Sequence, residues 1–288
     1  MTGSLQDKVA IVTGASRGIG KGIALALGEL GATVYLTGRT VDAGGMLPGT
    51  ISETAKEVTA AGGTGIAVPV DHHEDAQVEA LVARVLDEHG RIDVLVNNVY
   101  PSPDLAAWLG QNFWELPIES WDAVIDIGLR SHYVAAVFAA KSMVAAGSGL
   151  IINVSSSGAV QYAHNVSYGV GKAALDRMTK DMAKELEPHG VNVVSLWPGL
   201  VRTELVMFGA KQSDDGRATL ELPGEGEFDL ALAQSPLFVG RAAAALAVAP
   251  DIKQRSGGAF AVADLARAYG FTEDDGSQPD TILRPDAT

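Results

Sequence analysis

A tyrosine and a lysine four residues apart, Tyr168 and Lys172, are the side chains of this sequence best suited to acid–base chemistry. On a helix this spacing places both side chains on one face, about one turn apart. A phenol ionises at about pH 10, and an adjacent ammonium favours the phenolate. Such a pair can give a proton to a carbonyl oxygen or take one from an alcohol. The same spacing also occurs on solvated helix faces, so this interpretation needs support from the rest of the chain.

Composition limits the classes of function open to this chain of 288 residues, of which 47% are hydrophobic. A net charge of −14 disfavours nucleic-acid and anionic-membrane partners. The absence of cysteine excludes disulfides, zinc–thiolate sites and a cysteine nucleophile. The N-terminal residues are polar, and no stretch reaches about 18 uncharged apolar residues. We therefore expect a cytoplasmic protein.

Segments typical of strands and helices alternate along the chain. Because the expected strands are nearly all apolar, the pattern predicts βαβ units and a doubly wound parallel sheet with helices on both faces. No repeat or linker is evident, so we expect one domain, residues 1–271, followed by an acidic tail at 272–288. The expected strands are 8–13, 33–37, 65–70, 92–96, 150–154, 191–196 and 259–262; the expected helices are 18–30, 51–61, 76–89, 119–146, 167–188 and 235–249.

A glycine-rich segment, Gly14-Ala15-Ser16-Arg17-Gly18-Ile19-Gly20, lies between the first expected strand and the first expected helix. Glycines let the backbone turn sharply and approach a pyrophosphate, and a helix N-terminus offers N–H groups to an anion. The spacing is GxxxGxG instead of the common GxGxxG, and a plain glycine turn is the alternative. The strand before it and the helix after it favour a dinucleotide site.

The end of the second expected strand bears on the choice of cofactor. In dinucleotide sites an acidic residue there binds the 2′-hydroxyl of NAD, whereas an arginine suits the 2′-phosphate of NADP. Here the strand ends Thr37-Gly38-Arg39-Thr40, without a carboxylate. Arg39, and less specifically Arg17, could pair with the extra phosphate; the alternative is a surface arginine. The sequence predicts a preference for NADP(H), with NAD(H) as the alternative.

Together these motifs resemble the short-chain dehydrogenase/reductase family over about residues 5–265. Asp71 is similar to the family's adenine-contacting aspartate, and Asn97-Asn98 resembles the start of its NNAG motif. Tyr168 and Lys172 match its YxxxK, and residues 198–203 match its PGxxxT turn. One branch of the family is especially similar in the segments GLRSHY, NVSYGVGKAA, SLWPGLVRTEL and DLARAYG.

This resemblance implies a single-domain Rossmann-type fold, a doubly wound parallel sheet of about seven strands, and hydride transfer with a nicotinamide cofactor. Tyr168 would be the general acid/base, Lys172 would tune it, and a serine would hold the substrate oxygen. Counting from Asn153 selects Ser156, and counting back from the tyrosine selects Ser155; we favour Ser156. The implied cofactor-binding residues are Gly14, Ser16, Arg17, Gly18, Ile19, Gly20, Arg39, Asp71, Asn97, Tyr168, Lys172, Pro198, Gly199, Val201 and Thr203, and no metal site is expected.

The chain departs from the family pattern at two places. The NNAG motif here reads Asn97-Asn98-Val99-Tyr100, and the added bulk could reshape the nicotinamide side of the site. The catalytic asparagine expected in the helix 119–146 is replaced by Gly128. In many members that asparagine holds a water behind the lysine. The similar branch shares both changes, which favours a different water arrangement over an inactive enzyme.

Other polar and aromatic residues have structural interpretations beside functional ones. His72-His73-Glu74-Asp75 fits a helix start better than a metal site, and His132 fits a satisfied helix histidine better than a catalytic one. Trp108, Trp114 and Trp121 could cover a substrate pocket or pack on a helix. Residues 204–234 occupy the position of the family's substrate lid, and part of this segment could close over an apolar substrate or be disordered without a ligand.

The resemblance implies an oxidoreductase that interconverts a small carbonyl compound and its alcohol. A 3-oxoacyl thioester reductase and a dinucleotide-binding sensor or scaffold with little turnover are the alternatives. Family members commonly form dimers or tetramers through two long helices, here near 119–146 and 167–188, so a homo-oligomer is expected. The sequence does not identify the substrate or the direction of the reaction.

Overall fold

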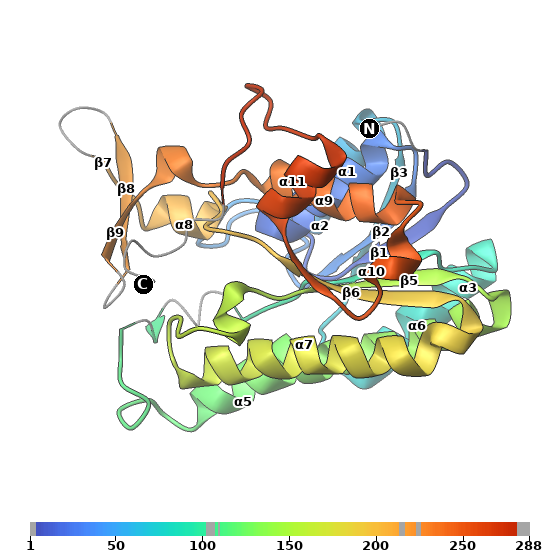
Figure 1. Ribbon diagram of the computed structural model, residues 1–288, viewed down its shortest axis with the longest axis horizontal. Coiled ribbons are helices and arrows are strands. Elements are labelled where there is room, and N and C mark those ends of the chain that lie inside the picture. The colour runs from blue at the N-terminus through green and yellow to red at the C-terminus, as the bar shows by residue number, and fades with distance from the viewer. Residues whose placement is uncertain (1–3, 102–106, 109, 213–216, 223–225, 281–288) are drawn as a thin grey trace.

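A seven-stranded parallel sheet forms the centre of the molecule in the computed structural model, which describes residues 4–101, 107–108, 110–212, 217–222 and 226–280. The strands run in the order β10-β6-β5-β4-β1-β2-β3 (Figure 1). The direction of winding therefore reverses between β1 and β4, where such folds bind ligands. The strands are β1 Val9–Val12, β2 Thr33–Gly38, β3 Thr64–Pro69, β4 Val94–Asn97, β5 Gly149–Val154, β6 Val191–Trp197 and β10 Ala259–Ala261.

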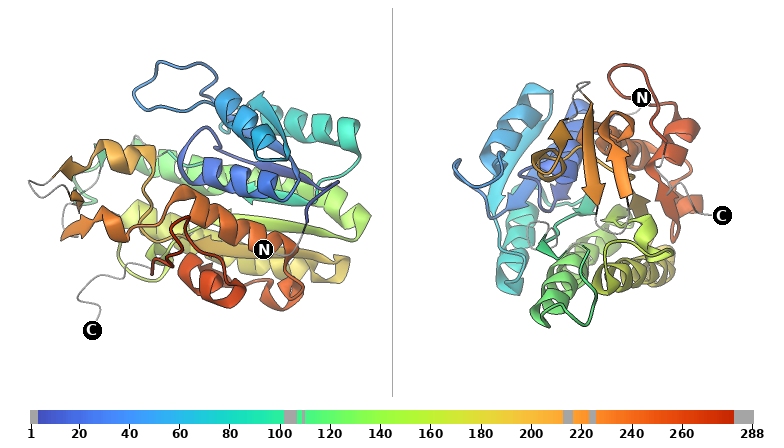
Figure 2. Two further views of the ribbon diagram at one scale, coloured as in Figure 1. Left: turned by 90° about the horizontal axis from the view of Figure 1, so that it is seen from above. Right: turned by 90° about the vertical axis from the view of Figure 1, so that its left-hand side faces the viewer.

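Helices cover both faces of this sheet (Figures 1 and 2). One face carries α1 (Gly18–Glu29), α2 (Ile51–Ala60), α9 (Pro236–Val248) and α11 (Val262–Tyr269). The other carries α3 (Asp75–His89), α5 (Glu119–Ile125), α6 (Ser131–Ala146) and α7 (Val166–Leu186). Two hydrophobic clusters lie between the layers, one on each side of the sheet. The sheet is thus buried on both faces, which explains its almost wholly apolar strands.

The predicted fold class is confirmed, including the seven strands and the parallel arrangement. Every expected strand and helix is present within a few residues of its expected bounds. The short helices α10 (Ile252–Arg255) and α11 were not expected, and neither were the short 3₁₀ turns Ser157–Ala159, Glu187–His189 and Leu230–Leu232.

The long expected helix at 119–146 is continuous but not uniform. A single π-helical turn, η1 (Asp126–Arg130), joins α5 to α6. Such insertions are uncommon and frequently occur at functional sites. The whole segment Glu119–Ala146 is long and apolar enough to cross a membrane by length and composition alone. In this fold its apolar side chains contribute to the hydrophobic cluster between α6 and the sheet, as in the core helices of many globular proteins.

A small antiparallel sheet lies beyond the carboxyl ends of the main strands (Figure 1). It consists of β7 (Lys211–Gln212), β8 (Ala218–Leu222) and β9 (Gly226–Asp229), and it follows the short helix α8 (Glu204–Phe208). Together these elements form the segment 204–234, called the lid here, of which residues 213–216 and 223–225 lie outside the described part. Leu220, Leu230 and Ala233 form its own small hydrophobic cluster.

The expected acidic tail differs from an exposed terminus over its first residues. Glu273 is buried and accepts hydrogen bonds from the backbone N–H and the hydroxyl of Ser235, the N-cap of α9. Arg241 on α9 donates to the carbonyl of Thr272 and pairs with Asp274. This segment therefore packs on the domain. The remainder of the tail, 281–288, lies outside the described residues.

Candidate active site

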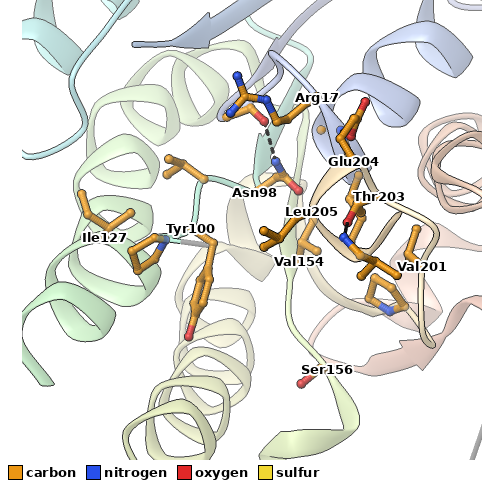
Figure 3. A pocket seen from close by; sticks show the side chains of 18 of the residues that line it. Arg17, Asn98, Tyr100, Ile127, Val154, Ser156, Val201, Thr203, Glu204 and Leu205 are labelled. Carbon is orange, nitrogen blue, oxygen red and sulfur yellow. Dashed lines mark hydrogen bonds between the residues drawn. The ribbon is translucent and has the colours of Figure 1, made fainter. Parts of the chain in front are cut away.

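A cleft of about 900 Å³ opens at the carboxyl ends of the strands. It lies beyond the ends of the neighbouring strands β1 and β4 and is bordered by the glycine-rich loop, the end of β5, the start of α7 and the lid (Figure 3). Its position is the one that the strand order predicts for a ligand. Of the residues predicted for the site, all line this cleft except Asn97.

The glycine-rich loop has the backbone conformation that its sequence predicts. Gly14 and Gly18 have positive φ angles of 67° and 56°. Residues other than glycine rarely adopt such angles. A Cβ atom at Gly20 would overlap the carbonyl oxygen of Gly14 and the amide of Asn98. The Asn98 Nδ2 donates to the carbonyls of Thr13 and Gly14 at 2.9 and 3.1 Å, which ties the loop to the end of β4.

The first turn of α1 already holds an anion from the protein itself. The backbone N–H of Gly18 donates to Oε2 of Glu204 at 2.7 Å, and Figure 3 shows Glu204 beside this helix. Helix N-termini bind carboxylates and phosphates through the same N–H groups and the same dipole. The carboxylate of Glu204 thus occupies a position suited to a phosphate oxygen. This contact and the close-packed glycines fit a dinucleotide.

The two arginines beside the cleft, Arg17 before α1 and Arg39 after β2, have different surroundings. Arg17 donates from Nε to the carbonyl of Pro48 and from Nη2 to the carbonyl of Gly49, both at 2.9 Å. It therefore holds the segment that follows β2. Arg39 is exposed and lines the cleft directly after Gly38.

Tyr168 is fixed by the way α7 begins. Asn165 is the N-cap, and its side chain accepts from the backbone N–H of Tyr168 at 2.9 Å, as N-cap residues commonly do. The hydroxyl of Tyr168 donates to Oγ of Ser156 at 2.9 Å. The ring of His164 packs edge-on against that of Tyr168, with the ring centroids 4.6 Å apart. A phenol and an alcohol thus meet at one point of the cleft.

Lys172 lies one turn further along α7 and is buried. Its Nζ donates to the carbonyl of Val154, at the end of β5, at 3.0 Å. Burial lowers the pKa of Lys172 to about 8, while the carboxylate of Asp176, a further turn along, acts in the opposite direction. Nζ lies 5.7 Å from the centroid of the Tyr168 ring. A cation close to this phenol favours its ionised form.

The consecutive serines after β5 have different roles in the structure. Ser156 faces Tyr168, whereas Ser155 is buried and directs its Oγ to the carbonyl of Lys172 at 3.4 Å. The consecutive asparagines after β4 divide in the same way. Asn97 is buried and donates to Oδ1 of Asn153 at 2.9 Å, so it supports the strand ends from behind. Its neighbour Asn98 lines the cleft.

The histidines of the 72–75 segment contact neighbouring side chains of the protein. In the described part of the chain, no group of three or more His, Cys, Asp or Glu side chains could hold a metal ion. His72 is buried, and its Nε2 lies 2.8 Å from Oγ1 of Thr37, within hydrogen-bond distance. Burial lowers the pKa of His72 to about 4. His73 contacts Asp71 at 3.0 Å. Burial raises the pKa of Asp71, but the hydrogen bonds from His73 outweigh it and lower the pKa overall.

Two other sequence interpretations concern side chains that could have bordered the cleft. Trp108, Trp114 and Trp121 do not line the cleft, and Trp114 is 69% exposed. His132 is buried, with Nε2 against the carbonyl of Val99 at 3.0 Å. Burial and the charge of Lys172 lower its pKa to about 3, so it is neutral. It therefore packs behind the site.

Several residues of the site were not predicted from the sequence. Asp176 continues the four-residue spacing of Tyr168 and Lys172, which was an available signal. Glu204 follows directly on the PGxxxT turn, and nothing in its local sequence points to the glycine-rich loop. His164 precedes the N-cap of α7, but its edge-on contact with Tyr168 has no sequence signal.

Comparison with known proteins agrees with this geometry. The family model for the short chain dehydrogenase matches residues 8–214. Dehydrogenase/reductase SDR family member 1 from Mus musculus is 44% identical over 278 residues, which cover 96% of this chain and 86% of the relative. The branch resemblance predicted from the sequence is thereby confirmed.

Solved structures are similar over most of the chain. A putative dehydrogenase from Xanthomonas campestris has a TM-score of 0.78 at 27% sequence identity. The match covers 97% of this chain and 95% of the Xanthomonas chain. A metagenomic short-chain oxidoreductase in complex with NADP has a TM-score of 0.69 at 31% identity, covering 89% and 96% respectively. The chain therefore belongs to the short-chain dehydrogenase/reductase family, and it is an oxidoreductase.

Proposed function

We propose that this enzyme interconverts a small ketone or aldehyde and its alcohol with NADP(H), and that Tyr168 is the general acid/base. The observation that carries this proposal is the 2.9 Å contact between the hydroxyls of Tyr168 and Ser156, with the buried Lys172 one turn away. A carbonyl oxygen placed between the two hydroxyls receives two hydrogen bonds, one of them from the proton donor.

Each residue has a distinct role in this mechanism. A bound nicotinamide supplies or accepts the hydride. Ser156 holds the substrate oxygen and orients the carbonyl carbon. Tyr168 delivers a proton to that oxygen as negative charge develops, or removes it in the reverse direction. Lys172, held by the carbonyl of Val154, favours the ionised phenol. Leu205, Val206 and Phe208 of the lid line the cleft and would exclude water from an apolar substrate.

The proposed preference for NADP(H) rests on the position of Arg39 beside Gly38. It is supported by the similar oxidoreductase whose structure was solved with NADP. The test is to follow NADPH consumption over a panel of ketones, aldehydes and a 3-oxoacyl thioester, with NADH in parallel. Turnover of simple carbonyls supports the proposal, and turnover of the thioester alone supports the reductase alternative. Cofactor binding without turnover on any of them indicates a sensor or scaffold.

Substitution of the two serines separates their roles. We expect Ser156→Ala to lower kcat about 100-fold, because the substrate oxygen loses a hydrogen-bond donor in the transition state. We expect Ser155→Ala to leave kcat within a few-fold of the parent and to cost about 1 kcal/mol of stability. Steady-state kinetics and thermal unfolding of both variants test this assignment. The opposite pattern would assign the role to Ser155.

Removal of the Glu204 carboxylate tests the cofactor site without any substrate. Because Glu204 occupies the N–H of Gly18, we expect Glu204→Ala to tighten NADPH binding about three- to tenfold. The control is Glu227→Ala, which removes an exposed carboxylate from β9 of the lid. Fluorescence titration of NADPH measures both. Equal or weaker binding by Glu204→Ala would contradict a phosphate site at α1.

We propose a homodimer or homotetramer assembled through α5, α6 and α7. The exposed surface of these helices carries large apolar side chains, namely Trp121, Tyr133, Val137, Val166 and Val170. A patch of this kind is typical of a contact between subunits. Sedimentation measurements would test it. The cytoplasmic location remains a prediction.

A further inference from the structure

We propose that Tyr100 and Gly128 form a reciprocal pair, in which the ring of Tyr100 fills the space of a side chain at position 128 and holds the ammonium of Lys172 in place. Tyr100 is then a positioning residue for the Tyr168–Lys172 pair. The kinetic part of the test depends on the proposed function, whereas the structural part does not.

The two departures from the family motifs contact one another in the fold. A Cβ atom built at Gly128 would lie 2.6 Å from Cε2 and 3.0 Å from Cδ2 of Tyr100. Real Cβ atoms are not found so close to a neighbour, so any larger residue at 128 requires the ring to move. Gly128 lies in the π-helical turn η1, and Figure 3 shows Tyr100 beside the helix that carries Ile127. A large residue at 100 thus requires a small one at 128.

The Tyr100 ring contacts the charged group of the site. Lys172 Nζ lies 4.5 Å from the centroid of the Tyr100 ring, nearer than the 5.7 Å that separates it from the Tyr168 ring. An ammonium over an aromatic face is stabilised by the ring quadrupole, and more strongly where both are shielded from water. The ring therefore offsets part of the desolvation that burial imposes on Lys172.

The other groups around Lys172 do not provide this contact. Asp176 acts on its charge from the next turn of α7, and its Oδ2 accepts from Nε1 of Trp197 at 3.0 Å. His132 is neutral because burial and Lys172 lower its pKa to about 3. The carbonyl of Val154 accepts one hydrogen bond from Nζ. The face of Tyr100 is thus the aromatic surface nearest to the ammonium.

The ring of Tyr100, and not its hydroxyl, makes these contacts. The hydroxyl is buried and has no hydrogen-bond partner among the described residues. Burial, and then the proximity of Tyr168, raise its pKa well above that of an ordinary tyrosine, so it stays protonated. The ring also packs edge-on against that of Tyr168, with centroids 6.0 Å apart. A phenylalanine keeps all of these ring contacts, and a leucine removes them.

The first test needs no substrate. Ultraviolet difference titration of each protein against the same protein carrying Tyr168→Phe isolates the ionisation of Tyr168. We expect Tyr100→Phe to keep the parent midpoint and Tyr100→Leu to raise it by about half a pH unit or more. Thermal unfolding shows that each variant is folded. An unchanged midpoint in Tyr100→Leu would overturn the proposal, whatever the enzyme's substrate.

The second test uses the reciprocity. We expect Gly128→Asn to lower turnover at least about tenfold, because the new side chain displaces the ring. The double variant Tyr100→Gly with Gly128→Asn restores the family's residue at both positions, and we expect it to recover most of this loss. If Gly128→Asn fails to fold, recovery of folding in the double variant supports the pair equally. A double variant no better than either single variant would contradict it. A parent that turns over no carbonyl refutes the proposed function, while the titration still decides this inference.

Discussion

Replacement of Tyr168 by phenylalanine is expected to lower turnover by orders of magnitude while leaving the site intact. The substitution removes only the hydroxyl that contacts Ser156 and keeps the ring contacts with Tyr100 and His164. Loss of a positioned general acid costs about 10²- to 10⁴-fold in rate, and we expect kcat to fall within this range. Because the hydroxyl is the only group removed, the dissociation constant for NADPH should change less than about threefold. Steady-state kinetics and a fluorescence titration measure the two quantities.

A matched substitution separates the chemistry of Tyr168 from general loss of a phenol. Tyr133→Phe removes a tyrosine hydroxyl from α6, outside the cleft, and keeps the ring that the proposed subunit contact uses. We expect its kcat to equal that of the parent. If Tyr168→Phe retained half or more of the parent turnover, the proton would have another source and the proposed mechanism would be wrong.

The fold could be predicted from the sequence because its pattern is repetitive. Each buried strand is a short run of β-branched and aliphatic residues, and helical segments alternate with the strands, so a parallel sheet covered by helices follows from general rules. The lid could not be predicted in this way. Its strands β7, β8 and β9 are short and carry exposed Lys211, Glu221 and Glu227. β8 does have an alternating apolar face, formed by Ala218, Leu220 and Leu222. Strands of two, five and four residues are nevertheless too short for periodicity to predict a sheet.

The candidate site could be predicted as far as its residues follow strand ends. Ser156, Asn98 and the glycine-rich loop meet because parallel strands end at one edge of the sheet. The choice between Asn97 and Asn98 depends on which face each side chain takes, and two identical neighbours give no signal. The contact between Tyr100 and Gly128 depends on tertiary packing across 28 positions of the chain. Each appears in the sequence as a separate departure from a motif, and only the fold joins them.

The largest expected change in cofactor preference follows substitution of Arg39. We expect the parent to favour NADPH. We expect Arg39→Asp to lower kcat/KM for NADPH about 100-fold and to raise kcat/KM for NADH. A hydrogen-bonded ion pair with a phosphate contributes about 1.5–3 kcal/mol, which corresponds to roughly 10- to 150-fold. The introduced carboxylate also repels the 2′-phosphate and can accept from the 2′-hydroxyl of NADH. Measurement of kcat/KM with both cofactors gives the switch directly.

Two further variants identify the cause of such a switch. Arg39→Gln removes the charge without adding a carboxylate. We therefore expect it to lower kcat/KM for NADPH without raising kcat/KM for NADH. Arg17→Ala removes the bonds to the carbonyls of Pro48 and Gly49, which hold the loop after β2, where Met46 and Leu47 line the cleft. Because neither hydrogen bond distinguishes the two cofactors, we expect Arg17→Ala to lower kcat/KM for NADPH and for NADH by similar factors. A parent that prefers NADH, or a selective loss of NADPH in Arg17→Ala alone, would transfer the phosphate site away from Arg39.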